Sequence, residues 1–136
     1  IDCKGKNAVV IGRSLVVGKP AAMMLMGKNA TVTVCHTKTV NTAEIARNAD
    51  ILVSAAGVLG SLTKEYVRPG QVVIDVSINW DAEKPNAKGG KGAIAGDAKF
   101  EEVEPIVEAI TPVPGGVGSV TTSVLMKHVV EAAERA

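Results

Sequence analysis

Short apolar runs rich in β-branched residues recur along the chain and are separated by more polar segments. Runs of this length without apolar–polar alternation are typical of parallel strands that are buried on both faces. The pattern predicts strands of this kind at Asn7–Gly12 and Gln71–Val76, and further strands at Thr31–Cys35, Asp50–Ala55 and Ala109–Val113. A shorter strand is expected at Ala93–Ala95.

The segments between these runs predict helices at 18–27, 42–48, 63–67, 98–103 and 118–135. Pro20 suits an early helical position and Gly27 a helix end, while Asn41 is expected to cap the second helix. Residues 81–92 are polar and rich in glycine and proline, so we expect them to form the most mobile loop.

Strands that alternate with helices through short connections require parallel pairing and right-handed crossovers. The sequence therefore predicts an α/β fold, a Rossmann-like doubly wound parallel sheet. With 136 residues, the chain is expected to form a single domain over residues 1–136. Ligands of such sheets bind at the carboxyl ends of the strands, which is where candidate site residues are sought.

Composition narrows the class of protein. Hydrophobic residues make up 46% of the chain and charged residues 21%, which excludes a disordered chain, and no apolar run approaches the roughly 18 residues of a membrane span. Three aromatic residues and no basic cluster give little material for nucleic-acid binding. The two cysteines form no CxxC pair, so a reducing, cytoplasmic compartment is expected, and no metal-binding or nucleophile–base motif is present.

Charge is uneven along the chain. Residues 1–48 carry seven Lys/Arg against two Asp/Glu, a net charge of +5, whereas residues 49–136 carry eight against twelve, a net charge of −4. An anionic ligand is therefore expected at the first half. The chain begins at Ile1 without Met or a signal-peptide pattern, and we expect it to be a domain of a longer protein.

The turn after the first strand, Gly12–Gly18, is a candidate phosphate site. Its glycines, Gly12 and Gly18, allow a tight turn and close backbone approach, and free N–H groups at the start of the following helix favour a phosphate. Ser14 stands where a GxGxxG motif has its second glycine. A plain connecting loop remains the alternative for this segment.

The second strand is followed by His36, Thr37 and Lys38, with no acidic residue. A site that prefers NAD usually places Asp or Glu here to accept from the ribose 2′-OH. Arg13 with the Thr37 hydroxyl and His36 or Lys38 would instead hold a 2′-phosphate, which favours NADP. A solvated basic strand end is the alternative.

The later strand ends add candidates for the rest of a nucleotide site. Small residues around Ala55 would let a nucleotide lie against the backbone, and Ile78 offers an apolar contact to a nicotinamide ring. Two prolines and three glycines fix the shape of the loop at 112–118, directly before the last helix, which suits a ligand wall.

Five segments, VVIGRSLVVGKPAAMML, CHTKT, VVIDVSINW, AIAGD and ITPVPGGVGSVTTSVLM, closely resemble the cofactor-binding domain of the methylenetetrahydrofolate dehydrogenase/methenyltetrahydrofolate cyclohydrolase family. The resemblance spans essentially the whole chain and implies a Rossmann fold that binds NADP or, in some members, NAD. It places Gly12, Arg13 and Ser14 at the phosphates and Thr37 with Arg13 at the 2′-phosphate. It places Ala55 and Ile78 beside the nicotinamide, with Thr121 closing the site.

Two positions depart from the family pattern, because Ser119-Val120 replaces Pro-Met and Ser77 replaces a frequent glycine. The resemblance also implies a preceding folate-binding domain, absent from this chain, that supplies the catalytic Tyr and Lys. The whole enzyme would oxidise 5,10-methylenetetrahydrofolate to the methenyl cation and hydrolyse it to 10-formyltetrahydrofolate. The isolated chain, with no catalytic residue, is expected to bind cofactor without turnover and to form homodimers.

Two alternatives remain at this level. One is a non-catalytic nucleotide-binding or regulatory module. The other is a methyltransferase that uses S-adenosylmethionine, which is disfavoured because the second strand lacks the acid that would hold the ribose.

Overall fold

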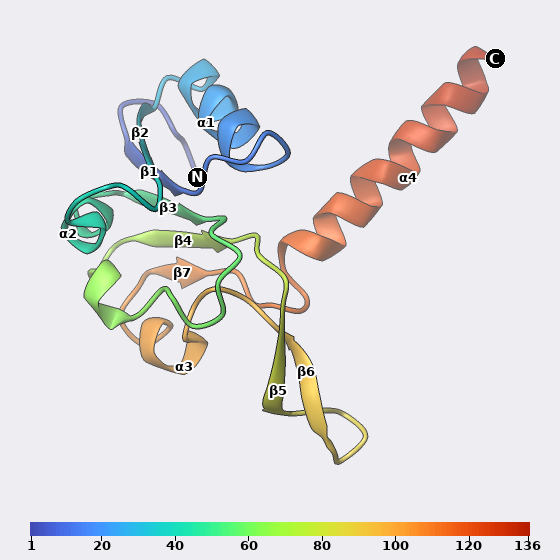
Figure 1. The fold of residues 1–136 in the computed structure, drawn as a ribbon. Helices are drawn as coiled ribbons and strands as arrows, with labels where there is room; N and C mark the ends of the chain where they lie inside the picture. Colours follow the sequence, from blue (N-terminus) through green and yellow to red (C-terminus); the bar gives the residue numbers. More distant parts are fainter.

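The computed structural model describes residues 1–136, and its centre is a parallel five-stranded sheet with the order β2-β1-β3-β4-β7 (Figure 1). The strands are β1 (Asn7–Ile11), β2 (Thr31–Cys35), β3 (Ile51–Ser54), β4 (Val72–Asp75) and β7 (Ala109–Ile110). After β1 the chain first adds β2 on one side and then β3 on the other, so the strand order reverses at β1. That reversal opens a crevice at the carboxyl ends of the strands. The α/β doubly wound fold is confirmed.

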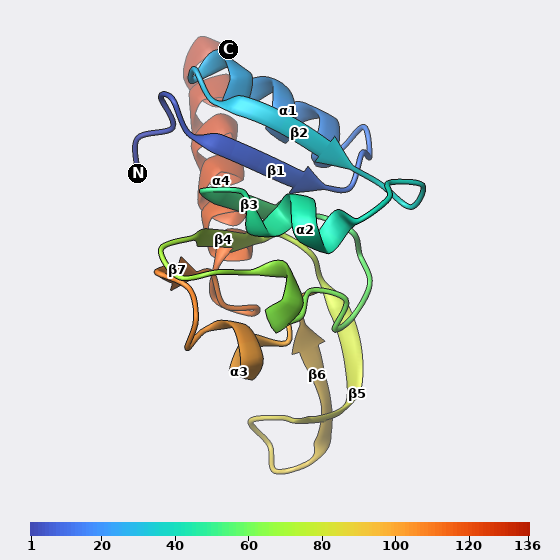
Figure 2. The same ribbon diagram turned by 90° about the vertical axis from the view of Figure 1, so that its left-hand side faces the viewer.

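Helices cover both faces of this sheet, with α2, η1 and α3 in front of the strands and α1 behind them, while α4 extends away from the sheet on the same side as α1 (Figure 2). The helices are α1 (Gly18–Gly27), α2 (Thr42–Arg47), the 3-10 turn η1 (Lys64–Tyr66), α3 (Phe100–Val103) and α4 (Val117–Arg135). No helix combines the length and the apolar character that a membrane crossing requires.

Each face of the sheet has its own apolar core, because successive side chains of a strand point to opposite faces. Val9 and Leu52 belong to the core beneath α2, η1 and α3, together with Ala46 and Val103. Val10 belongs to the core beneath α1. Continuous apolar runs are therefore needed, as the sequence pattern indicated.

The expectation that residues 81–92 form a loop is wrong. This segment forms most of an antiparallel hairpin, β5 (Asn79–Pro85) and β6 (Lys91–Ala95), which projects from the sheet (Figure 1). At its turn, the Asn86 side chain accepts hydrogen bonds from the N–H groups of Lys88 and Gly90 and donates to the carbonyls of Lys91 and Gly92. The polar residues thus satisfy the backbone of a turn instead of loosening it.

Smaller corrections concern element ends. Asn41 occupies the residue before α2 but has a left-handed backbone and makes no side-chain cap hydrogen bond, so its expected capping role is wrong. The last strand is shorter than expected, because only Ala109 and Ile110 pair with β4. In η1, the Thr63 hydroxyl accepts from the Glu65 N–H and starts the turn.

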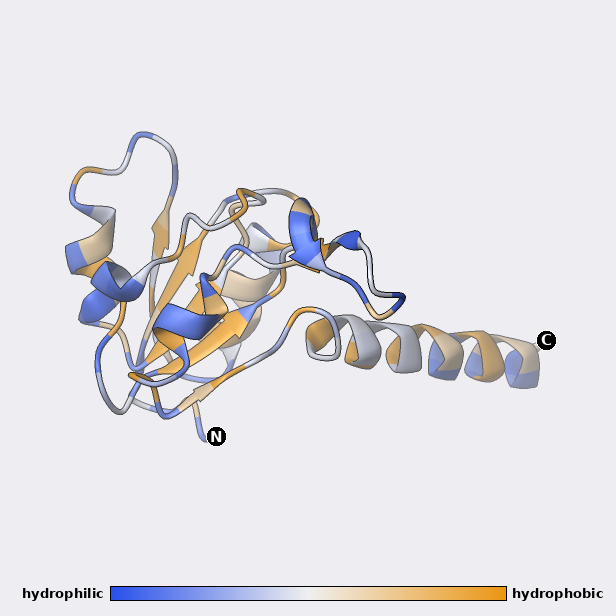
Figure 3. Cartoon of the chain, turned by 90° about the horizontal axis from the view of Figure 1, so that it is seen from below, coloured by the Kyte–Doolittle hydropathy of each residue, from blue (hydrophilic) through white to orange (hydrophobic).

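Helix α4 leaves the body of the domain (Figure 3). None of its residues is buried, and its apolar side chains, among them Leu125, Met126, Val129 and Val130, are exposed. Both the polar and the apolar residues of α4 are accessible, because no other part of the chain covers this helix. This helix therefore presents uncovered apolar side chains.

Candidate functional site

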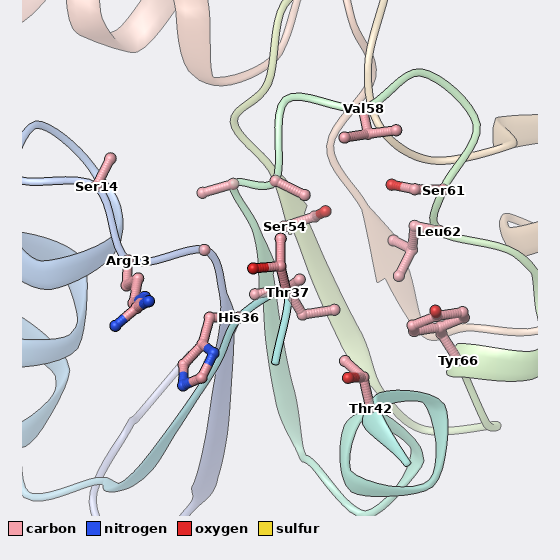
Figure 4. Close-up of a pocket in the computed structure, with 14 residues that line it drawn as sticks. Arg13, Ser14, His36, Thr37, Thr42, Ser54, Val58, Ser61, Leu62 and Tyr66 are labelled. Carbon is pink, nitrogen blue, oxygen red and sulfur yellow. The ribbon is translucent and has the colours of Figure 1, made fainter. Parts of the chain in front are cut away.

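A cleft of about 380 Å³ lies at the carboxyl ends of β1, β2 and β3, where the strand order reverses. Figure 4 shows Arg13 and His36 on one side of it and Ser61, Leu62 and Tyr66 on the other. None of the lining residues is an Asp or Glu. The cleft is therefore open to an anion and has an apolar wall opposite its cationic side.

The turn between β1 and α1 supplies hydrogen-bond donors to this cleft. The Ser14 hydroxyl accepts from the N–H groups of Val17 and Gly18, and the Ser14 carbonyl accepts from Lys19. The N–H groups at the helix start, which were expected to be free, are thus already bonded. The N–H groups of Arg13 and Ser14 themselves have no acceptor in the chain, so the free donors belong to the turn.

Gly12 and Gly18 let three backbone segments meet behind this turn. Gly12 has a φ of +117°, and a Cβ atom there would lie 2.2 Å from the Ala55 carbonyl oxygen. A Cβ atom on Gly18 would lie 2.2 Å from the Gly12 carbonyl oxygen. Both glycines are needed for close packing, with Gly12 lining the cleft and Gly18 buried beneath it.

The end of β2 provides the polar side of the cleft. His36 and Thr37 line it, as does Arg13 from the neighbouring turn, whereas Lys38 does not. The His36 Nδ1 atom accepts from the Lys38 N–H at 3.2 Å, which fixes the short turn after the strand. The guanidinium of Arg13 forms no ion pair and donates no hydrogen bond within the chain, so it is available to a ligand.

Five of the eight site residues expected from the sequence line this one cleft: Gly12, Arg13, Ser14, Thr37 and Ala55. Gly18 does not line the cleft and is buried beneath it. Ile78 and Thr121 lie outside it: the Ile78 side chain is 69% exposed, and the Thr121 hydroxyl donates to the Val117 carbonyl of its own helix.

Sequence reasoning missed the far wall of the cleft, formed by Thr42, Val58, Ser61, Leu62 and Tyr66. These residues follow two different strands and share no local motif, so spacing gave no signal for them. The one distinctive residue of this wall is Tyr66, the single tyrosine of the chain, which lies within the predicted helix at 63–67.

Two buried aspartates lie behind the cleft. Asp97 is fully buried and bonded to Ser54 and Ser77. Asp75 accepts from the N–H groups of Ser77 and Ala98. Burial raises the pKa of Asp75. Burial alone would also raise the pKa of Asp97, but hydrogen bonds, chiefly from Ser77, Asn79 and Ser54, outweigh it and lower that pKa.

A comparison with family models and a comparison with known proteins point to the same family. The model of the tetrahydrofolate dehydrogenase/cyclohydrolase NAD(P)-binding domain matches residues 1–136. The chain is 58% identical over 134 residues to the bifunctional protein FolD of Carboxydothermus hydrogenoformans, covering 98% of the chain and 45% of that relative. It is 53% identical over 135 residues to a bifunctional protein FolD of Clostridium botulinum, covering 99% and 45%. The chain thus spans less than half the length of these relatives.

Solved structures agree. A FolD methylenetetrahydrofolate dehydrogenase/cyclohydrolase from Campylobacter jejuni superposes with a TM-score of 0.86 at 43% identity, covering 99% of this chain and 45% of that one. The Trypanosoma brucei enzyme, solved with NADP cofactor and an inhibitor, has a TM-score of 0.87 at 39% identity, covering 100% and 47%. The chain therefore belongs to the tetrahydrofolate dehydrogenase/cyclohydrolase family, as its NAD(P)-binding domain.

Proposed function

We propose that this domain binds NADP in the cleft at the ends of β1, β2 and β3. The observation that carries the proposal is the unpaired guanidinium of Arg13, which lines the same cleft as Thr37, a cleft without any carboxylate. A 2′-phosphate is favoured where a cation and a hydroxyl meet and no acid repels it. NAD, which carries a 2′-OH at that point, gains nothing from this cation.

The cleft has groups for the other parts of the cofactor as well. The free N–H groups of Arg13 and Ser14 would bind the phosphates, with Gly12 allowing the ligand close to the backbone. Ala55 would line the nicotinamide side. Ile78 and Thr121 lie outside the cleft. They would contact the nicotinamide ring only where a further domain adjoins this one.

In a protein of the length of the relatives, this domain would serve 5,10-methylenetetrahydrofolate dehydrogenase and methenyltetrahydrofolate cyclohydrolase activities. When bound, NADP supplies the hydride acceptor for the first of these. The residues of this chain orient the cofactor, and orientation is the main contribution that a protein makes to such a transfer. Folate binding and the catalytic groups would belong to the folate-binding domain.

Two further proposals concern the setting of the domain. We place it in homodimers, an assignment supported by the exposed apolar residues of α4. We place it in the cytoplasm, supported by the two cysteines, Cys3 and Cys35, which are both free thiols.

Titration calorimetry of the 136-residue chain with NADP and with NAD tests the cofactor assignment. We expect NADP to bind and NAD to bind more weakly. Failure to bind either nucleotide would refute the proposed site, and equal affinity would refute the role given to the 2′-phosphate. An assay with methylenetetrahydrofolate is expected to show no turnover by this chain alone.

A further inference from the structure

The carboxylate of Asp97 accepts six hydrogen bonds, although its side chain is fully buried and does not line the cleft. Oδ2 accepts from the hydroxyls of Ser54 and Ser77 and from the N–H groups of Ala56 and Gly57, at 2.7 to 3.2 Å. Oδ1 accepts from the N–H of Val58 at 2.8 Å and from the Asn79 side chain at 3.1 Å. A buried charge with this many donors is compensated by the protein itself.

The donors come from two stretches of the chain, 54–58 and 77–79. Ser54 ends β3, Ala56 to Val58 form the loop after it, and Ser77 and Asn79 follow β4. The main chain of Asp97 adds a third link, because its carbonyl accepts from the N–H of Leu62 at 3.0 Å. Asp97 thus joins the ends of β3 and β4 to Val58 and Leu62 of the far cleft wall.

The loop from Ala56 to Val58 depends on this carboxylate. Its three successive N–H groups all donate to Asp97, and within the chain only that of Gly57 has a second acceptor, the Ser77 hydroxyl at 3.2 Å. Ala56 and Val58 line the cleft. The loop is itself exposed, so apolar packing contributes little to its position.

We propose that Asp97 is a positioning residue for the cofactor, holding the cleft wall from Ala56 to Val58 in its binding conformation without touching the ligand. This inference rests on the proposed NADP function of the cleft. Asparagine at this position would have one acceptor oxygen, and its NH₂ group would face backbone N–H donors. Asp97→Asn would therefore release part of the wall while leaving the cationic side of the cleft, Arg13 and Thr37, in place.

The test compares Asp97→Asn with a matched control, Asp50→Asn. Asp50 also accepts from a backbone N–H, that of Asn7, and from a side chain, that of Arg68, but it lies at the amino end of β3, away from the cleft. NADP affinity is measured by calorimetry well below the melting temperature of each variant. We expect Asp97→Asn to weaken NADP about tenfold or more, the scale of one lost charge-assisted hydrogen bond, and Asp50→Asn to leave it unchanged.

A spectroscopic measurement separates positioning from a general loss of stability. In amide NMR spectra, the N–H signals of Ala56, Gly57 and Val58 are expected to move upfield in Asp97→Asn, because they lose a charged acceptor. The signals of the β1–α1 turn are expected to stay. A loss of NADP affinity with unchanged loop signals would overturn the proposal, as would moved loop signals with wild-type affinity.

Should Asp97→Asn fail to fold, Ser77→Ala decides instead. It removes the hydroxyl that joins Gly57 to Asp97, so a smaller loss of NADP affinity with a shifted Gly57 signal is expected, and wild-type values for both would overturn the proposal. If the unaltered chain itself does not bind NADP, the proposed function fails and the role of Asp97 fails with it. If the unaltered chain binds and only the variants behave as wild type, the role of Asp97 alone fails.

Discussion

The residues of the site differ in whether the chain itself provides hydrogen-bond or ion-pair partners for their side chains. Arg13 has no partner within the chain and faces an open cleft, whereas Asp97 is buried and fully bonded. The first could be predicted from the sequence, because a basic residue in a turn after a buried strand is a local pattern. The second could not, since its donors lie up to 43 residues away in sequence and meet it only through the fold.

Arg13→Ala is predicted to weaken NADP by about 1.5–3 kcal/mol, the contribution of a hydrogen bond between charged groups, while NAD affinity barely changes. Calorimetry with both nucleotides measures the difference. Lys28→Ala, which removes a cation of the same sign beyond the end of α1, serves as the control and should change neither affinity. Equal losses for NADP and NAD would contradict the assignment of the 2′-phosphate to Arg13.

Thr37→Glu is predicted to move preference from NADP toward NAD. A carboxylate at this point of the cleft would repel a 2′-phosphate and accept from a ribose 2′-OH. The ratio of the two dissociation constants is the quantity to follow, with Thr37→Gln as a control of similar size and no charge. An unchanged ratio would place the ribose elsewhere.

Stability toward acid should depend on Asp97. Burial would raise its pKa, yet hydrogen bonds hold that pKa below the ordinary value of 3.8. A carboxyl group with a lowered folded-state pKa contributes stability that is complete above the unfolded-state pKa and is lost as pH falls through the folded-state one. Asp75, whose pKa burial raises, acts with the opposite sign, its contribution being lost as pH rises.

Denaturant unfolding from about pH 7 down to about pH 3 measures this contribution. We expect the unfolding free energy of the unaltered chain to fall with acidification by more than that of Asp97→Asn, which has no carboxyl to protonate there. Asp75 is present in both proteins, but the Asp97 charge also raises its pKa, so Asp75 gains less stability on acidification in Asp97→Asn and the comparison gives a lower bound for the contribution of Asp97. Parallel curves for the two proteins would contradict this prediction.

At the scale of elements, the central strands were predictable because burial on both faces leaves a continuous apolar run in the sequence. The β5–β6 hairpin was predictable only in part: the expected strand at Ala93–Ala95 lies within β6, but the rest of the hairpin is mostly polar and packs on no core. What holds it is strand pairing together with specific polar contacts: Asn86 at the turn and the Lys84 ammonium, which donates to the carbonyls of Ile94 and Val113. Such contacts have no periodicity to find.

Asn86→Ala is predicted to loosen the tip of this hairpin, because four hydrogen bonds between its side chain and the turn are lost. Hydrogen exchange of the Gly90 amide should accelerate, while exchange in β1 and β3 stays unchanged. Lys88→Ala lies in the same turn and removes only an exposed side chain, so it is the matched control. Equal protection of Gly90 in both variants would mean that the strands alone fix the turn.

At the scale of the molecule, the domain is unevenly covered. Helix α1 packs on one face and α2, η1 and α3 on the other, but α4 stands clear of both (Figures 1 and 3). Exposed apolar surfaces, such as that of α4, tend to be covered by association with another protein chain. The family resemblance implies a preceding folate-binding domain, and in this chain we expect a second copy to cover the exposed apolar residues of α4.

The chain is predicted to be at least partly dimeric at micromolar concentration, as measured by sedimentation. Val129→Glu, on the exposed apolar side of α4, should shift the distribution toward monomer. Lys127→Glu changes charge on a more polar side of the same helix and should alter it less. A sedimentation profile that is strictly monomeric for the unaltered chain would refute the prediction.

The β5–β6 hairpin also carries the single tryptophan of the chain, Trp80, with 68% of its surface exposed, whereas the single tyrosine, Tyr66, lines the cleft. The two chromophores therefore sit on separate parts of the molecule. Emission excited at the red edge of the indole band reports whether something covers the hairpin, and quenching of the phenol reports an occupied cleft. The native protein thus has an optical reporter for each surface without any added label.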